Sequence, residues 1–136
     1  MPEPVHVTHL AGDQFQITIR GHQLRVDQPL DAGGHDAAPT PTELFVASLA
    51  SCVAHYARRY CARHDINTDG LDVRATYQIG EHPTRVSQIT VTLTPPHALP
   101  AERYEAFLAV ASHCTVHNSL EQPPDTRIEL ASGHRP

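Results

Sequence analysis

The strongest constraint on the fold is a helical segment that is apolar on nearly every side. It begins with Thr-Pro-Thr-Glu at residues 40–43, which supplies an N-cap threonine, a proline in the first turn and a capping-box glutamate. From there to Val53, only Ser48 and Ser51 interrupt the apolar surface. A helix that is apolar all round has to be covered all round. We therefore predict a buried helix over 41–64, packed centrally against a second copy in a homodimer.

Alternation of apolar and polar residues predicts strands on both sides of this helix. The expected strands lie around residues 5–7, 15–19, 24–26, 71–79, 89–93 and 128–130. A second helix is expected near 104–111, where apolar residues recur with helical spacing. The resulting order, β-β-β-α-β-β-α-β with hairpin connections, predicts an α+β fold with antiparallel sheets. The length of 136 residues predicts one domain, residues 1–136.

Composition excludes several functional classes. A net charge of −5 with scattered arginines argues against a nucleic-acid partner, because phosphate binding needs clustered basic side chains. No apolar stretch approaches the ~20 residues that span a bilayer, so no membrane association is expected. The first residues lack the basic-then-apolar pattern of a signal peptide. We expect a cytoplasmic protein whose thiols start reduced.

Three cysteines are the candidate reactive groups. Cys52 lies in the apolar helix, Cys114 lies at or just past the end of the second helix, and Cys61 falls in the polar half of the first helix. A single buried thiol behaves as a small hydrophobic side chain, which is the alternative reading for each of them. Cys52 and Cys114 are each set in a distinctive segment, so this pair suggests thiol redox chemistry, whereas Cys61 is expected to be incidental.

Three segments resemble motifs of the OsmC/Ohr family, the osmotically inducible protein C and organic hydroperoxide resistance proteins. Residues 41–52, PTELFVASLASC, are similar to the family's helix around its first cysteine. Residues 114–118, CTVHN, are similar to the segment around its second cysteine, and residues 27–36 resemble the loop before the helix. The expected order of elements also matches, so the resemblance covers nearly the whole chain.

This resemblance implies a thiol peroxidase built as an intertwined homodimer, with antiparallel sheets wrapped around central helices. Cys52 would react with an organic or inorganic hydroperoxide to give a sulfenic acid, and Cys114 would resolve it as a disulfide. An external dithiol would then reduce the disulfide, and no cofactor would be needed. The implied role is defence against oxidative stress.

The chain departs from the family pattern around the group that activates the first cysteine. Family members use a glutamate directly after the helix-starting proline and an arginine from the N-terminal hairpin. Here Thr42 follows the proline, and Glu43 comes one residue later, where the capping box explains it. Arg20, Arg25 or His55 could supply the positive charge near Cys52, with Glu43 able only to orient a cation.

Two alternatives to the peroxidase stay open. His113 and His117 flank Cys114, which could suggest a zinc site, but adjacent residues are poorly placed for tetrahedral ligation, so no metal is expected. The second alternative is a non-catalytic protein of the same fold that binds a small apolar or thiol-reactive ligand at the dimer interface. The missing arginine and glutamate favour this alternative, whereas the presence of both cysteines favours the enzyme.

Overall fold

The computed structural model describes residues 2–132, which divide into two compact units. The first unit contains residues 2–51 and 73–93, and the second contains residues 52–72 and 94–132. Helix α1 (Pro41–Arg63) is the long helix that the sequence predicts, and it runs through both units.

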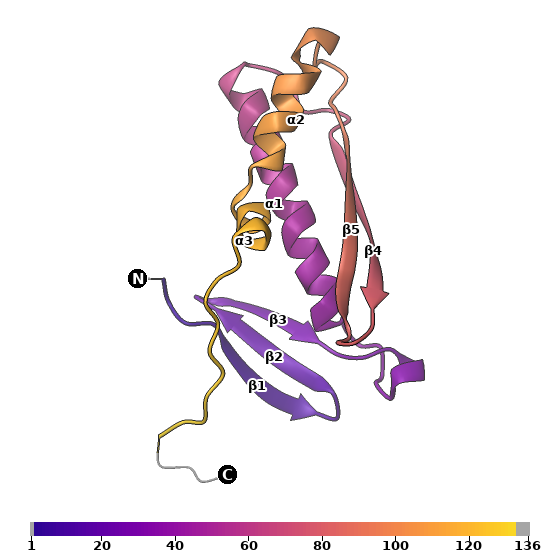
Figure 1. Ribbon diagram of the computed structural model, residues 1–136, viewed down its shortest axis with the longest axis vertical. Coiled ribbons are helices and arrows are strands. Elements are labelled where there is room, and N and C mark those ends of the chain that lie inside the picture. The colour runs from indigo at the N-terminus through magenta and orange to yellow at the C-terminus, as the bar shows by residue number, and fades with distance from the viewer. Residues whose placement is uncertain (1, 133–136) are drawn as a thin grey trace. The chain divides into compact units, whose positions relative to one another are not determined.

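The first unit contains an antiparallel sheet of three strands, β1 (His6–Ala11), β2 (Gln14–Ile19) and β3 (His22–Val26), in that order (Figure 1). Its register places Ile17 opposite both Val7 and Leu24. Directly paired residues share a face of a sheet, so these three form one apolar patch. Gly12, with φ of 55°, occupies the tight turn between β1 and β2. The three strands expected at the N-terminus are confirmed.

The predicted hairpin is also confirmed. Strands β4 (Asp72–Gly80) and β5 (Arg85–Thr94) form a two-stranded sheet. The start of β5 lies beside the start of α1, because residues of both line one hollow of about 370 Å³.

The two ends of α1 are stabilised by the local sequence. At the start, the Thr40 N–H donates to Glu43 Oε1 at 2.8 Å, and the Glu43 N–H donates to Thr40 Oγ1 at 3.0 Å. The predicted capping box is therefore confirmed. At the other end, Asp65 takes a left-handed conformation with φ of 53°, and the Ile66 N–H donates to the Cys61 carbonyl at 2.8 Å. This Schellman-type ending stops the helix at Arg63, one residue before the predicted end at residue 64.

The second unit packs the latter half of α1 against η2 (Ala101–Arg103), α2 (Tyr104–Ser112) and α3 (Thr115–Glu121). In its core, the rings of Tyr60 and Phe107 meet edge to face with centroids 5.7 Å apart. The other buried side chains among the described residues of this unit are Val53, Ala57, Cys61, Pro96, Leu99, Ala111 and Cys114. Within residues 2–132, no helix combines the length and hydrophobicity needed to cross a membrane.

The α+β class with antiparallel sheets is confirmed, but two elements differ from the prediction. Helix α3 was not anticipated. The strand predicted at 128–130 is wrong: within the described chain this segment has no strand structure, and Ile128 is 98% exposed. Alternation in so short a segment was insufficient, because a strand needs a neighbour to pair its backbone groups.

Helix α1 buries only part of its surface within one chain. Along one side, Val46, Leu49 and Val53 are buried, whereas Phe45 on another side is 43% exposed. The serines at 48 and 51 are exposed as well. The burial on all sides that the sequence predicts is therefore not found in the single chain.

Candidate functional site

Cys52 and Cys114 both lie in the second unit and are neighbours there. Cys52 is half-buried on α1, and Cys114 is fully buried at the N-cap of α3. The side chain of Cys52 lies close enough to the Cys114 thiol to influence its pKa. All three cysteines are free thiols. The two cysteines singled out from the sequence are thus close together although they are far apart along the chain.

The surroundings of Cys114 favour its protonated form. Burial is the largest effect and raises the pKa of this thiol, and the neighbouring Cys52 raises the pKa further. Backbone N–H groups of His117 and Val116 act in the opposite direction, and the His117 N–H donates to Cys114 Sγ at 3.4 Å. Cys114 is therefore a protonated thiol at neutral pH.

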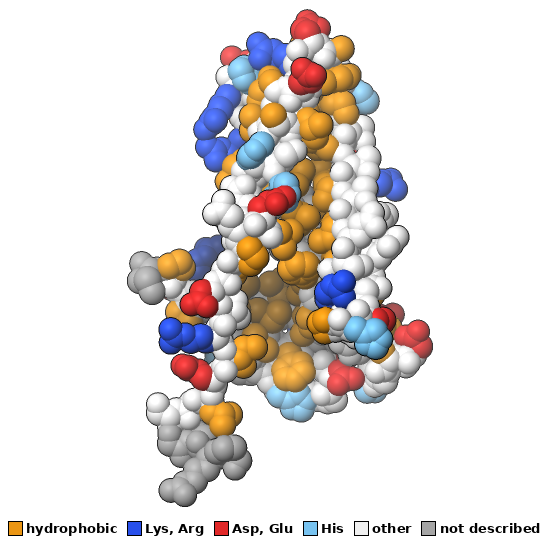
Figure 2. All heavy atoms as spheres, viewed as in Figure 1, with side chains coloured by type: hydrophobic (Ala, Val, Ile, Leu, Met, Phe, Trp, Pro, Cys, Tyr) orange, Lys and Arg blue, Asp and Glu red, His pale blue; other side chains and the backbone are white. Residues whose placement is uncertain are grey.

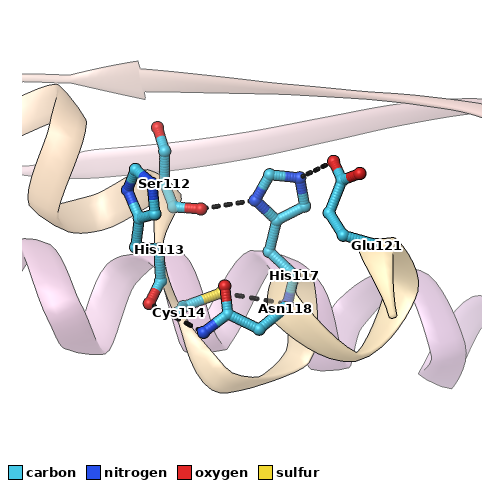
Figure 3. Close-up of polar contacts among 6 residues, drawn as sticks. All are labelled: Ser112, His113, Cys114, His117, Asn118 and Glu121. Carbon is cyan, nitrogen blue, oxygen red and sulfur yellow. Dashed lines mark hydrogen bonds and ion pairs between the residues drawn. The ribbon is translucent and has the colours of Figure 1, made fainter. Parts of the chain in front are cut away.

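The side chain of His117 ties together the two helices that meet at Cys114 (Figure 3). Its Nδ1 contacts the carbonyl oxygen of Ser112, the last residue of α2, and its Nε2 lies 3.2 Å from Glu121 Oε1 at the end of α3. Asn118 adds a bond from its side-chain amide to the His113 carbonyl at 3.4 Å. These contacts span the α2–α3 junction and hold the backbone on either side of Cys114.

A hydroxyl pair links α1 to the same junction. Tyr56 lies one turn beyond Cys52, and its hydroxyl is 3.0 Å from Thr115 Oγ1. Thr115 follows Cys114 directly. This hydrogen bond therefore joins a residue one helical turn from Cys52 to the residue that follows Cys114.

The structure places the proposed activating residues in different parts of the chain. Arg20, with φ of 57°, lies in the turn after β2, and Arg25 lies on β3 opposite Gln16. Glu43 is engaged in the capping box of α1. These three belong to the first unit, whereas His55 belongs to the second, where its ring meets Tyr56 edge to face at 5.6 Å.

Cys61 and the histidines around Cys114 have structural roles. Cys61 is fully buried, and burial raises the pKa of its thiol. His113 Nδ1 lies 2.6 Å from the Ala109 carbonyl oxygen, and His117 Nδ1 contacts the Ser112 carbonyl oxygen. Across residues 2–132, no group of three or more His, Cys, Asp or Glu side chains is arranged to hold a metal ion.

The sequence interpretation missed the roles of His117, Tyr56 and Thr115. The sequence does contain one signal for helix α3, because Val116 and Leu120 have the four-residue spacing of a helix face. Cysteine is not among the usual N-cap residues, so the start of α3 at Cys114 was hard to recognise. The contact between Tyr56 and Thr115 joins residues 59 positions apart, and local sequence patterns carry no information on such a pair.

Comparison with known proteins adds a family model described as OsmC-like protein, which matches residues 33–129. A candidate osmotic stress induced and detoxification response protein from Psychrobacter arcticus is 25% identical, with 85% of each chain covered and a TM-score of 0.78. An OsmC-like protein of unknown function from Vibrio cholerae is 18% identical over 89% of this chain and 95% of its own, with a TM-score of 0.73.

An organic hydroperoxide resistance protein OsmC from Legionella pneumophila is 20% identical, with 87% of this chain and 89% of its own covered and a TM-score of 0.63. At these identities, the Vibrio and Legionella proteins show a shared fold. No curated protein sequence matches this chain.

Proposed function

Because this chain belongs to the OsmC-like protein family, we propose that it reduces hydroperoxides by a mechanism that uses two cysteines. The observation that carries the proposal is that two free thiols, half-buried Cys52 and buried Cys114, are neighbours close enough for one to influence the pKa of the other. The name of the Legionella relative, an organic hydroperoxide resistance protein, supports the choice of substrate.

In the proposed reaction, the Cys52 thiolate attacks the terminal oxygen of the hydroperoxide. The O–O bond breaks, the hydroxyl of the peroxide stays on Cys52 as a sulfenic acid, and the alkoxide leaves as the alcohol after taking up from solvent the proton that Cys52 released on ionising. The Cys114 sulfur then attacks the sulfur of the sulfenic acid while its thiol proton passes to the departing hydroxyl, so that a disulfide forms and water is released. An external dithiol reduces this disulfide by thiol–disulfide exchange and is itself oxidised.

The two environments support this division of roles. Only a thiolate is an effective nucleophile, and the raised pKa of Cys114 keeps that thiol protonated. Cys52 is the more exposed of the pair and is therefore better placed to meet a peroxide. Once the peroxide has reacted, Cys114 is already a neighbour of the oxidised sulfur.

We infer that Arg20, Arg25 or His55 promotes ionisation of Cys52, that the protein acts as a cytoplasmic homodimer, and that both units form one domain. The family match over 33–129 includes residues of both units, which supports the single domain.

The test is peroxide consumption in the presence of a dithiol, with cumene hydroperoxide and hydrogen peroxide compared. We expect Cys52→Ser to abolish turnover and Cys114→Ser to leave one stoichiometric oxidation that stops at the sulfenic acid or beyond. Cys61→Ser is the matched control, since Cys61 lies in the same helix and should leave turnover unchanged.

The outcome against the proposal is a wild-type protein that consumes no more peroxide than Cys52→Ser. The alternative, a non-catalytic protein that binds a small apolar or thiol-reactive ligand, would then replace the enzyme. Peptide mapping gives an independent check, because peroxide should link Cys52 to Cys114 and leave Cys61 free.

A further inference from the structure

A groove between α2 and the latter half of α1 has no role in the redox steps proposed above. Its volume is about 390 Å³, which is within the size range of small-molecule sites. It is lined by Tyr56, Arg59, Arg63, Ala109, Val110 and His113, all from the second unit. Tyr56 bonds to the residue after Cys114, and His113 directly precedes it, so the groove adjoins the thiol pair.

One part of this groove is cationic. Arg59 and Arg63 lie one helical turn apart on the same face of α1. Within residues 2–132, neither arginine forms an ion pair. Arg59 lies over the ring of Tyr56, with Cζ 5.5 Å from the ring centroid, a contact that leaves its N–H groups able to donate. Figure 2 shows basic side chains gathered beside the upper end of α1.

The other part is apolar. Ala109 and Val110 come from α2, and the Tyr56 ring contributes from α1. The ring of His113 is fixed nearby through its bond to the Ala109 carbonyl. An apolar surface next to two unpaired guanidinium groups is complementary to a molecule with an alkyl part and an anionic head, and arginine binds a carboxylate through paired N–H donors.

We propose that this groove binds an amphipathic carboxylate, with its head group on Arg59 and Arg63 and its alkyl chain against Ala109, Val110 and Tyr56. Where it concerns the reaction, this inference rests on the proposed function. The carboxylate belongs to one of the two reactants, either the hydroperoxide or the dithiol, and Arg59 and Arg63 are then its specificity-determining residues.

Direct binding tests the groove without any turnover. Octanoate is titrated into the full-length protein in a calorimeter. Two comparison ligands are 1-octanol, which lacks the charge, and acetate, which lacks the long alkyl chain. We expect octanoate to bind roughly tenfold more tightly than either of them, and Arg59→Gln or Arg63→Gln to weaken octanoate by a similar factor. Binding should also weaken with added salt, because the head group is held by charge.

Arg58→Gln is the matched control. Arg58 neighbours Arg59 on the same helix but lines a different hollow, with Ile66 and Asp69, so its loss should leave octanoate binding unchanged. The proposal is overturned if 1-octanol binds as tightly as octanoate, or if Arg58→Gln is as damaging as the other two substitutions. It is equally overturned if Arg59→Gln or Arg63→Gln turns a dimer into a monomer, since the groove would then be a subunit contact.

Kinetics then separates the two sources of the carboxylate. Arg63→Gln should raise KM about tenfold for the reactant that carries the carboxylate and leave KM unchanged for its uncharged counterpart. One comparison uses a hydroperoxide with and without a carboxylate, and the other uses a dithiol with and without one. A protein that binds octanoate but consumes no peroxide would refute the proposed function and leave the binding site intact, whereas the reverse result would refute the site alone.

Discussion

At the scale of single residues, the carboxylate of Asp27 organises the loop that leads into α1. Asp27 is fully buried, and its oxygens accept backbone N–H groups of Gln28 at 2.7 Å, His35 at 3.2 Å and Ala37 at 3.0 Å. The backbone bond to Ala37 is the largest of the effects that lower the pKa of Asp27, and burial opposes it. At Gly34, a Cβ atom would lie 2.0 Å from the Gln28 carbonyl oxygen, so this loop also requires a glycine.

We predict that Asp27→Asn lowers the Tm by several degrees, because an amide nitrogen would replace an oxygen that accepts N–H donors. The effect should depend on pH. A carboxyl group whose pKa is lowered by folding stabilises the folded state above its unfolded pKa of about 3.8, and this contribution is lost as the pH falls through the folded value.

Thermal unfolding between about pH 6 and pH 3 measures both effects. The difference in Tm between wild type and Asp27→Asn should shrink toward the acid end. Exposed Asp31, in the same loop, provides the control substitution Asp31→Asn, which should change little. A constant difference in Tm over the whole range would show that the charge of Asp27 is not the stabilising feature.

At the scale of elements, the junction between α2 and α3 sets the position of Cys114. His117 bridges Ser112 and Glu121, and the Tyr56 hydroxyl reaches Thr115 from α1. Cys114 therefore lies at a point where three helices are linked by side-chain contacts. We infer that these contacts hold its sulfur in reach of Cys52, which is the requirement for rapid resolution of a sulfenic acid.

The hydroxyl pair allows a specific prediction. Thr115→Val and Tyr56→Phe each remove one hydroxyl, and each should slow disulfide formation roughly threefold, since an exposed hydrogen bond contributes about 0.5–1 kcal/mol. Rapid-mixing measurements with one equivalent of peroxide give the rate. Because both changes remove the same bond, the double variant should be no slower than either single variant.

Ser119→Ala is the control for this cycle, since it removes a hydroxyl from α3 that bonds to the Thr115 carbonyl instead. Its rate of disulfide formation should match that of the wild type. Additive effects of the two substitutions would mean that Tyr56 and Thr115 act separately, and the hydrogen bond would then have no positioning role.

At the scale of the whole molecule, the single chain leaves much apolar surface exposed. Large apolar side chains that gather on an exposed face are typical of interaction surfaces. The exposed fractions include 52% for Val7, 46% for Leu24, 43% for Phe45, 48% for Ile79 and 57% for Leu108. This exposure, together with the small residues on the open side of α1, supports the proposed homodimer.

We therefore expect sedimentation at micromolar concentration to give about twice the chain mass of 14.9 kDa. Ser51→Arg should shift this equilibrium toward monomer, because Ser51 lies on the exposed side of α1, where a second helix would have to approach closely. Thr68→Arg, a similar change in an exposed loop, should not. A stable monomer of the wild-type protein would contradict the dimer.

The sequence alone determined most of the elements of this protein. Strand alternation, the capping box of residues 40–43 and helical spacing are short-range patterns, so strands β1–β5, α1 and α2 could be predicted, and with them the fold class and the family. The absence of a strand at 128–130 was not predictable, because strand formation depends on backbone pairing that the side-chain pattern does not specify.

Only the tertiary structure decided how the candidate site is arranged. The contact of Cys52 with Cys114, the pair of Tyr56 with Thr115, and the groove around Arg59 each join segments that are distant along the chain. Such contacts arise from the packing of α1 against α2 and α3, and packing depends on which faces meet. The sequence could name the two cysteines, but the raised pKa of Cys114 and the neighbours of both thiols follow from packing and burial, which exist only in the folded chain.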